Sequence, residues 1–254
     1  MTEETLYLKC KPGDIAPRVL LTGDPARVHR VAEMLEDAGE VRNNREFATA
    51  TGTYQGVPVS VVSGGIGAPS TAIAMHELAQ LGARVIVRVG TMMGIDAPLE
   101  SVVIPTGAAR FEGTSTHYLP TNYPAVPNLM LVQALIVASR QHKLSAQYGL
   151  TATYDAFYPD MAPALIGLGV PDLTVARRAG VLSMDMESSL VFVLGMVLSI
   201  ATAAMCLVTV QADPLRQLDP TVRATCEQRM LWAALDGLVM FEDGLEWHGR
   251  NAPD

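Results

Sequence analysis

Short apolar runs alternate with longer stretches of helical periodicity along this chain of 254 residues. The apolar runs are rich in valine and isoleucine and are bounded by turn residues, which is typical of buried strands. They cover residues 18–21, 57–63, 85–89, 102–106, 150–153 and 203–210. The helical stretches cover residues 26–37, 70–81, 128–142, 185–198 and 220–238. This alternation predicts an α/β fold: a single domain over residues 1–254 with a mixed central sheet flanked by helices.

The most apolar segment of the chain, Leu190–Val210, is long enough to span a bilayer. However, Asp185 and Glu187 come directly before it, and no basic or aromatic residues flank it as interface anchors. Its second half is rich in β-branched residues. We therefore expect a helix over residues 186–198, a short turn and a buried strand over residues 203–210, and no membrane partner.

The composition narrows the possible functions. Hydrophobic residues make up 49% of the chain and charged residues 17%, which is enough for a large core. A net charge of −8 argues against general nucleic-acid binding, because that needs a basic surface. The three cysteines, Cys10, Cys206 and Cys226, form neither a zinc pattern nor a disulfide framework, so we expect a cytoplasmic protein.

Arginines recur beside turn residues in this acidic protein. Arg27 ends the stretch Gly-Asp-Pro-Ala-Arg, Arg45 lies in Asn-Arg-Glu-Phe, and Arg88 begins Arg-Val-Gly-Thr, while a glycine-rich turn covers residues 63–70. The planar guanidinium matches phosphate oxygens, and the hydroxyl of Thr91 with glycine amides can complete an anion site. Taken together these residues predict a site for phosphate or a phosphorylated ligand. For any one arginine alone, a surface or structural ion pair is the favoured explanation.

The expected positions of these residues favour one shared site. Arg27, Gly64–Gly67, Arg88–Thr91 and Asp213 all come just after expected strands. In open α/β sheets, ligands bind beyond the carboxyl ends of the strands. We therefore expect these residues to lie close together.

Two carboxylates, Asp185 and Glu187, stand where a very apolar helix is expected to begin. A buried carboxylate is costly unless it is hydrogen-bonded. The pair either complements the helix dipole or accepts the hydroxyls of a sugar. The apolar surroundings favour the sugar.

Other candidate residues have two interpretations each. Asp213 precedes a proline, which is typical of a turn, but it is also placed to act as a general acid. The aromatic group Phe157–Pro159 either stacks on a base or fills the core. Met92 and Met93 are expected to pack.

These segments, taken together, resemble the nucleoside phosphorylase-I family and, within it, the bacterial uridine phosphorylases. The resemblance runs from about residue 6 to about residue 238. The motifs that carry it are Gly23-Asp24-Pro25-x-Arg27-Val28, Arg45-Glu46-Phe47, Gly65-Ile66-Gly67-x-Pro69-Ser70-Thr71, Glu77-Leu78-Ala79-Gln80-Leu81-Gly82, Arg88-Val89-Gly90-Thr91, Tyr123-Pro124-Ala125-Val126, Phe157-Tyr158-Pro159 and Met186-Glu187-Ser188.

The resemblance implies an enzyme, a pentosyltransferase that cleaves the N-glycosidic bond of a nucleoside with phosphate. The products are the free base and (deoxy)ribose 1-phosphate, and phosphate is a co-substrate rather than a cofactor. The residues implied in phosphate binding are Gly23, Arg27, Arg45, Arg88 and Thr91.

Further roles come from the same resemblance. Met186 and Glu187 would hold the ribose, with Tyr7 or Leu8 in the place of a residue that a neighbouring subunit lends. The catalytic residues would be Arg88, Glu187 and Asp213, and Glu46, Ile66 and Ser70 match positions that bind a monovalent cation between subunits. The family forms homo-oligomers, either dimers or trimers of dimers.

The base pocket is where the chain departs from uridine phosphorylases. Met161 and Pro163 occupy the places of the glutamine and arginine that contact the uracil edge, and Met92 and Met93 intervene before Gly94. A site without its polar contacts loses discrimination by orders of magnitude. We therefore predict a base specificity altered from uridine, with a base pocket made of Met92, Met93, Phe157, Met161 and Gln211.

Two other functions remain open from the sequence. One is a nucleoside hydrolase that uses water in place of phosphate. The other is a weakly active homologue that binds a nucleoside. The retained arginines, Arg27, Arg45 and Arg88, argue against both.

Overall fold

A computed structural model describes residues 4–170, 172–212 and 214–241. Within these ranges a ten-stranded mixed sheet forms the centre of an α/β domain. Its strands are β1 (Arg18–Thr22), β2 (Arg42–Asn44), β3 (Phe47–Tyr54), β4 (Val57–Ser63), β5 (Val85–Gly94), β6 (Val102–Phe111), β7 (Ala146–Tyr154), β8 (Val181–Asp185), β9 (Ala201–Gln211) and β10 (Arg216–Gln217). The prediction of an α/β fold with a mixed sheet is confirmed.

The sheet runs in the order β10-β9-β6-β7-β8-β5-β1-β4-β3-β2. An additional parallel pairing joins β9 to β5. Because β5 also pairs with β8, the strands β5, β8, β7, β6 and β9 close into a ring, and β1 to β4 extend from it as an open sheet. The long strand β5 therefore belongs to both parts and contacts β1, β8 and β9.

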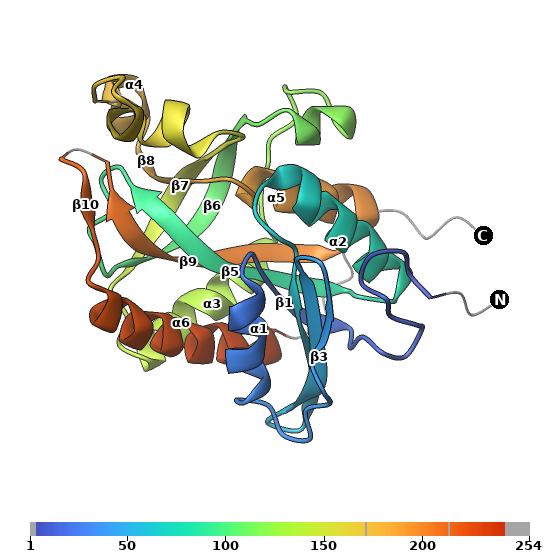
Figure 1. Ribbon diagram of the computed structural model, residues 1–254. Helices are drawn as coiled ribbons and strands as arrows, with labels where there is room; N and C mark the ends of the chain where they lie inside the picture. The colour runs from blue at the N-terminus through green and yellow to red at the C-terminus, as the bar shows by residue number, and fades with distance from the viewer. Residues whose placement is uncertain (1–3, 171, 213, 242–254) are drawn as a thin grey trace.

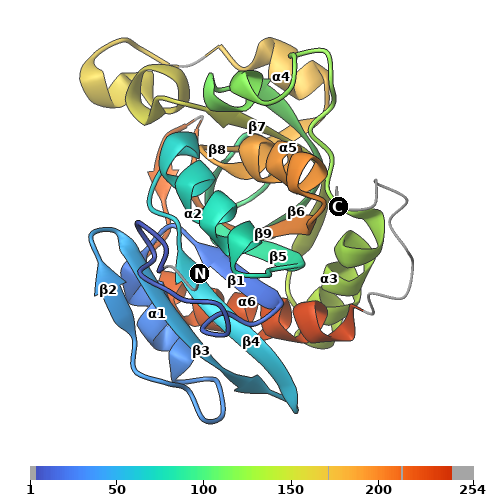
Figure 2. The same ribbon diagram turned by 90° about the vertical axis from the view of Figure 1, so that its right-hand side faces the viewer.

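Helices cover both faces of the sheet (Figure 1). Figures 1 and 2 show α2 and α5 packed side by side on one face, and α1, α3 and α6 on the other. The helices are α1 (Pro25–Ala32), α2 (Ala68–Gln80), α3 (Leu129–Gln141), α4 (Thr174–Arg178), α5 (Ser188–Leu198) and α6 (Pro220–Met240). The described residues also form three short helical turns: η1 (Thr114–His117), η2 (Phe157–Met161) and η3 (Pro163–Ile166).

The core follows these layers. One cluster of buried residues joins α2 and α5 to the sheet, with Met75 and Phe192 among its largest side chains. A second cluster joins α1, α3 and α6 to the opposite face, with Leu131 and Leu135 at its centre. Full burial of one such side chain is worth about 1.5–3 kcal/mol, so these clusters hold the strand ends in fixed positions.

Two helices that border the cavity described below begin with a capping aspartate and a proline in the first turn. Asp24 accepts a hydrogen bond from the backbone N–H of Ala26, and Pro25 occupies the first turn of α1. Asp219 caps α6 in the same way, ahead of another proline in the first turn. Such capping side chains satisfy backbone donors that have no partner within the helix.

The predicted strands and helices are present, with several different bounds. Strand β5 continues to Gly94, so Thr91 lies inside it rather than after it. Helix α1 ends at Ala32 instead of residue 37, because the chain tightens into turns in which Met34 and Leu35 donate to carbonyls three residues back.

The strands β2, β3, β8 and β10 and the helix α4 were not predicted. Strand β3 reads FATATGTY, whose alanines, threonines and glycine give little hydrophobic signal. Its pairing with β4 supplies the stability that its composition does not indicate. Strand β8 is only five residues long and gains its place from β5 and β7 on either side.

The apolar segment 190–210 divides between α5 and β9, as predicted. Helix α5 ends at Leu198, the next residue Ser199 has a left-handed φ of 55°, and β9 begins at Ala201. In the described part of the chain, no helix is both long and apolar enough to cross a membrane.

Candidate active site

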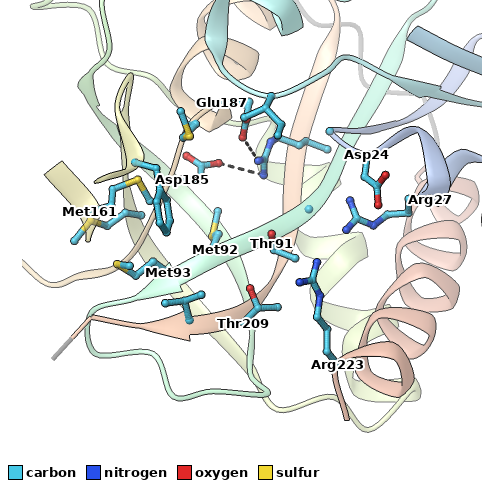
Figure 3. Close-up of a pocket in the computed structure, with 18 of the residues that line it drawn as sticks. Asp24, Arg27, Thr91, Met92, Met93, Met161, Asp185, Glu187, Thr209 and Arg223 are labelled. Atoms are coloured by element: carbon cyan, nitrogen blue, oxygen red, sulfur yellow. Dashed lines mark hydrogen bonds and ion pairs between the residues drawn. The ribbon is translucent and has the colours of Figure 1, made fainter. Parts of the chain in front are cut away.

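A cavity of about 490 Å³ opens where β5, β8 and β9 meet α1 and α6. Figure 3 shows its side chains pointing into this space from elements far apart in the sequence. It is lined by Gly23, Asp24, Pro25, Arg27, Ile66, Arg88, Gly90, Thr91, Met92, Met93, Phe157, Met161, Met184, Asp185, Met186, Glu187, Thr209, Val210 and Arg223.

An irregularity in β5 and β9 shapes the middle of the cavity. The register between these strands shifts between Met92 and Met93, so that Thr209 is the extra residue of β9. Consecutive side chains of a regular strand point to opposite faces, whereas a bulge redirects them. The shift explains how Met92, Met93 and Thr209 all reach the same cavity.

Arg88 is held by two carboxylates and a thiol. Its Nη1 group lies 3.1 Å from Oδ2 of Asp185 and 2.7 Å from Sγ of Cys206, and its Nη2 group donates to Oε2 of Glu187. Gly90 leaves room for this arrangement, because a Cβ there would lie 3.0 Å from Nη1 of Arg88. The guanidinium is therefore fixed on one side while it faces the cavity.

These neighbours set the protonation of the group. Burial alone would lower the pKa of Arg88, but contact with Cys206, Glu187 and Asp185 outweighs it and raises the pKa. Burial raises the pKa of the Cys206 thiol to about 11, so it stays neutral at pH 7. The two carboxylates thus face one cation.

Asp185 and Glu187 differ in their surroundings. Asp185 accepts hydrogen bonds from the hydroxyls of Thr153 and Ser188, so its partners belong to the protein interior. Glu187 accepts from the backbone N–H of Gly67 at 2.6 Å and from Arg88, while it lines the cavity. Of the two carboxylates, Glu187 has fewer protein donors among the described residues and is the better placed to accept more.

Arg27 lies across the cavity from this pair, on α1. Its Nη1 group donates to Oγ1 of Thr22 at 2.6 Å, and its Nη2 group lies 3.4 Å from Oε1 of Glu227 on α6. Its Nε has no partner among the described residues. Burial lowers the pKa of Arg27, but a guanidinium remains charged at neutral pH.

One end of the cavity is rich in sulfur. Met93, Met161 and Met184 pack together there, with Met186 and Phe157 partly buried against them. In Figure 3, Met161 and Met93 project into this end, away from Arg27. Among the described lining residues, the side-chain N–H donors belong to Arg27, Arg88 and Arg223 alone.

Several residues that sequence analysis placed in the site lie outside this cavity. Arg45 is exposed in the turn between β2 and β3, with its guanidinium 5.7 Å from the ring centre of Tyr7. Gln211 bonds to Arg216 and is not among the residues that line this cavity. Its side chain is drawn into the pairing of β9 with β10. Asp213 lies outside the described residues.

The three residues assigned to a cation lie near one another only in part. The hydroxyl of Ser70 donates to Oε1 of Glu46 at 3.3 Å. Ile66 is 76% exposed and lines the cavity edge. Within the described ranges, no group of three or more His, Cys, Asp and Glu side chains is arranged to hold a metal ion.

Three polar lining residues in particular were not predicted to belong to the site: Asp24, Thr209 and Arg223. Asp24 was quoted only as part of the motif that contains Arg27. Thr209 lay in an expected strand, and only the bulge turns it inwards. Arg223 did carry a signal, because a cation in the first turn of a helix opposes the helix dipole and calls for an explanation.

Comparisons with known proteins identify the family to which the chain belongs. Residues 17–232 match the family model described as the phosphorylase superfamily. A uridine phosphorylase from Thermococcus kodakarensis is 40% identical over 219 residues, which are 82% of this chain and 78% of that protein. The chain belongs to the nucleoside phosphorylase-I family.

Other relatives act on different bases, by their names. A guanosine phosphorylase from Halorubrum lacusprofundi is 33% identical over 204 residues, covering 80% of this chain and 81% of that protein. The crystal structure of a purine nucleoside phosphorylase from Toxoplasma gondii, in complex with immucillin-H, superimposes with a TM-score of 0.83 at 28% identity. That match covers 94% of this chain and 96% of the other. Membership makes this protein an enzyme of the pentosyltransferase class and leaves the base to be decided.

Proposed function

We propose that the protein cleaves a (deoxy)ribonucleoside with phosphate at this cavity, releasing a base other than uracil and (deoxy)ribose 1-phosphate. The observation that carries the proposal is the placement of Arg27, Arg88, Thr91 and Glu187 around a single cavity. These residue types match an anion at one side and sugar hydroxyls at the other. Inorganic phosphate is the co-substrate.

The chemistry follows from this placement. A phosphate oxygen forms a bond to the anomeric carbon while the bond from that carbon to the base nitrogen breaks, and the base takes up a proton as it leaves. Positive charge develops on the sugar between the two. Arg27, Arg88 and Thr91 would fix the phosphate beneath the anomeric carbon, which turns a bimolecular encounter into a positioned reaction. The phosphate anion then stabilises the developing charge.

Glu187 would accept the ribose hydroxyls, beside Met186. Its two oxygens already accept from Gly67 and Arg88, and each carboxylate oxygen has a second lone pair for a sugar hydroxyl. The resemblance assigns the proton donor to Asp213, which lies outside the described residues. No described residue is assigned to this role.

The altered base specificity is supported by the sulfur-rich end of the cavity. Met161, which stands where uridine phosphorylases carry a glutamine, is 2% exposed and packs with Met93. Such a surface holds a base by shape and by contact with Phe157 rather than by side-chain hydrogen bonds. Pro163 is buried but does not line the cavity, so only Met161 of the two replaced positions is placed to contact a base.

We further propose that Arg45 and Tyr7 complete the site of a neighbouring subunit in a homo-oligomer, a dimer or a trimer of dimers. Both are at least partly exposed and lie outside their own chain's cavity. Leu8 is buried whereas Tyr7 is partly exposed, so Tyr7 is the better placed of the two to reach a neighbour. A monovalent cation between subunits at Glu46, Ile66 and Ser70, and a role in cytoplasmic nucleoside salvage, belong to the same proposal.

The decisive experiment is a panel of nucleosides incubated with and without inorganic phosphate. Released base and sugar phosphate are both quantified by chromatography. We expect base release that depends on phosphate, with one (deoxy)ribose 1-phosphate per base, and uridine among the poorer substrates. Equal release without phosphate would make the protein a nucleoside hydrolase. No release from any nucleoside, despite measurable binding, would make it a nucleoside-binding homologue.

A further inference from the structure

Arg223 provides the cavity with a cation that the family resemblance did not assign. It lies in the first turn of α6, and its side chain is 47% exposed. Its Nε donates to Oε1 of Glu227 at 2.8 Å, one helical turn further on. Neither Nη group has a partner among the described residues. Figure 3 shows the guanidinium extending towards Thr91 and Arg27, with Thr209 beside it.

Glu227 connects this arginine to Arg27. The carboxylate is 2% exposed, and it accepts from Arg223, from Arg27 at 3.4 Å and from Nη2 of Arg30 at 2.9 Å. Burial alone would raise the pKa of Glu227, but Arg27, Arg223 and Arg30 outweigh it and lower the pKa. One buried anion thus fixes two cavity arginines, from α1 and α6, relative to each other.

The charge balance differs between the two sides of the cavity. Arg88 faces the two carboxylates of Asp185 and Glu187, so that side has no excess of positive charge. On the other side, Arg27, Arg30 and Arg223 are set against Glu227 and Asp24. Three cations and two anions leave a net charge of about +1 there, which attracts an anion.

The position of Arg223 on its helix has the same implication. A cation in the first turn is repelled by the partial positive charge of the helix N-terminus. The ion pair with Glu227 offsets part of this repulsion. An anion bound beside the helix N-terminus and the guanidinium would attract both positive charges and offset the remainder. Arg229, on the same helix, instead donates to the carbonyls of His142 and Lys143 and does not line the cavity.

We propose that Arg223 binds the phosphate co-substrate directly, together with Arg27 and Thr91, and that Glu227 is the positioning residue for both arginines. The inference rests on the proposed function, because it names a further ligand of the same co-substrate. Arg223 presents its Nη groups to the anion, and Glu227 holds its Nε edge away from it. Two arginines bound to one carboxylate cannot turn independently.

The test measures phosphate and nucleoside separately. Steady-state rates are recorded over a range of phosphate concentrations at saturating nucleoside, and over a range of nucleoside concentrations at saturating phosphate. The proteins compared are the wild type, Arg223→Gln, Arg223→Lys, Glu227→Gln and Arg229→Gln. Binding of inorganic phosphate to each protein alone is measured by calorimetry. Thermal unfolding establishes that each variant is folded.

We expect Arg223→Gln to raise the KM and the Kd for phosphate about tenfold or more, as loss of a charged hydrogen bond implies. The nucleoside KM should change far less. Arg223→Lys should recover part of the affinity, because it keeps the charge without the planar pair of donors. Arg229→Gln should match the wild type in the KM and Kd for phosphate and in the nucleoside KM.

Glu227→Gln separates positioning from electrostatics. Removing a negative charge beside the anion would tighten phosphate binding if charge alone mattered, whereas loss of the common anchor weakens it. We expect weaker binding. Tighter binding in Glu227→Gln, or phosphate constants within about twofold of the wild type in Arg223→Gln, would overturn the inference. If the wild type binds phosphate but catalyses no phosphorolysis, the proposed function is refuted. The role of Arg223 in phosphate binding is then decided by the calorimetric Kd values alone.

Discussion

Arg88 donates a hydrogen bond directly to the carboxylate of Glu187, so the residue that the sequence assigns to phosphate is paired with the one it assigns to ribose. Asp185 contacts the same guanidinium at 3.1 Å. The two proposed subsites therefore share one ion-pair network. A change on either side alters both the charge and the position of the group on the other.

The two carboxylates should separate activity from stability. Glu187→Gln is expected to lower kcat/KM by roughly a hundredfold or more, because a neutral amide is a weaker acceptor for sugar hydroxyls. Asp185→Asn should mainly lower the melting temperature, since Asp185 bonds to Thr153 and Ser188 in the interior. Steady-state kinetics and thermal unfolding of both variants provide the comparison. A larger loss of kcat/KM in folded Asp185→Asn would contradict the assignment of Glu187 to ribose.

Arg88→Gln should lower both catalytic activity and folding stability. It removes charged hydrogen bonds to the proposed phosphate, which costs roughly 3 kcal/mol or more of transition-state stabilisation. It also leaves Asp185 and Glu187 buried without their cation, a loss of about 3–5 kcal/mol of folding free energy. Rates must therefore be normalised to the folded fraction determined by denaturant titration.

The double variant Arg88→Gln with Glu187→Gln tests the pairing itself. Removing both charges should restore part of the lost stability, because no unpaired Glu187 carboxylate remains, while activity stays low. Arg18→Gln is the matched control: Arg18 lies on β1 and bonds to the carbonyls of Leu238 and Phe241, outside the cavity. It should change stability without changing kcat/KM. Strictly additive losses in the double variant would show that Arg88 and Glu187 do not interact.

The parts of the site that could be predicted from the sequence are those with a local signal. Arg27 follows a helix cap and Arg88 precedes a glycine, and both reach the cavity. Thr209 could not be recognised, because its direction depends on how β9 pairs with β5. Arg223 is brought to Arg27 only by the packing of α6, and Gln211 is turned away by pairing with Arg216. Pairing and packing between distant segments leave little trace in local sequence.

The fold shows the same limit. The apolar strands of the ring were recognised from the sequence. Strand β3, in the open part of the sheet, was not, because its stability comes from pairing with β4. The ring itself, closed by β5 with β9, has no sequence signature of its own.

The ion pairs of Glu227 should make stability depend on acid pH. The folded-state pKa of this carboxyl lies below its ordinary value of 4.5. Its contribution to stability is therefore fully present above that value and is lost as the pH falls through the folded-state pKa. The difference in unfolding free energy between the wild type and Glu227→Gln should be largest near about pH 7 and shrink below pH 4.5. Chemical denaturation at a series of pH values measures it, and a difference that grew on acidification would refute the assignment.

The base pocket gives the last prediction. Met161 is buried among Met93 and Met184, at the end of the cavity opposite Arg27. Met161→Gln places an amide where uridine phosphorylases carry one, with nearly the same volume and chain length. It should raise kcat/KM for uridine relative to the preferred nucleoside by about tenfold, which corresponds to one hydrogen bond of about 1.4 kcal/mol. Met161→Leu is the control, because it keeps the apolar surface without new donors, and it should leave the ratio unchanged. Competition assays with both nucleosides in one reaction measure the ratio directly. A wild type that cleaves uridine with a kcat/KM of about 10⁴ M⁻¹s⁻¹ or more, unaffected by Met161→Gln, would show that this methionine does not set the choice of base.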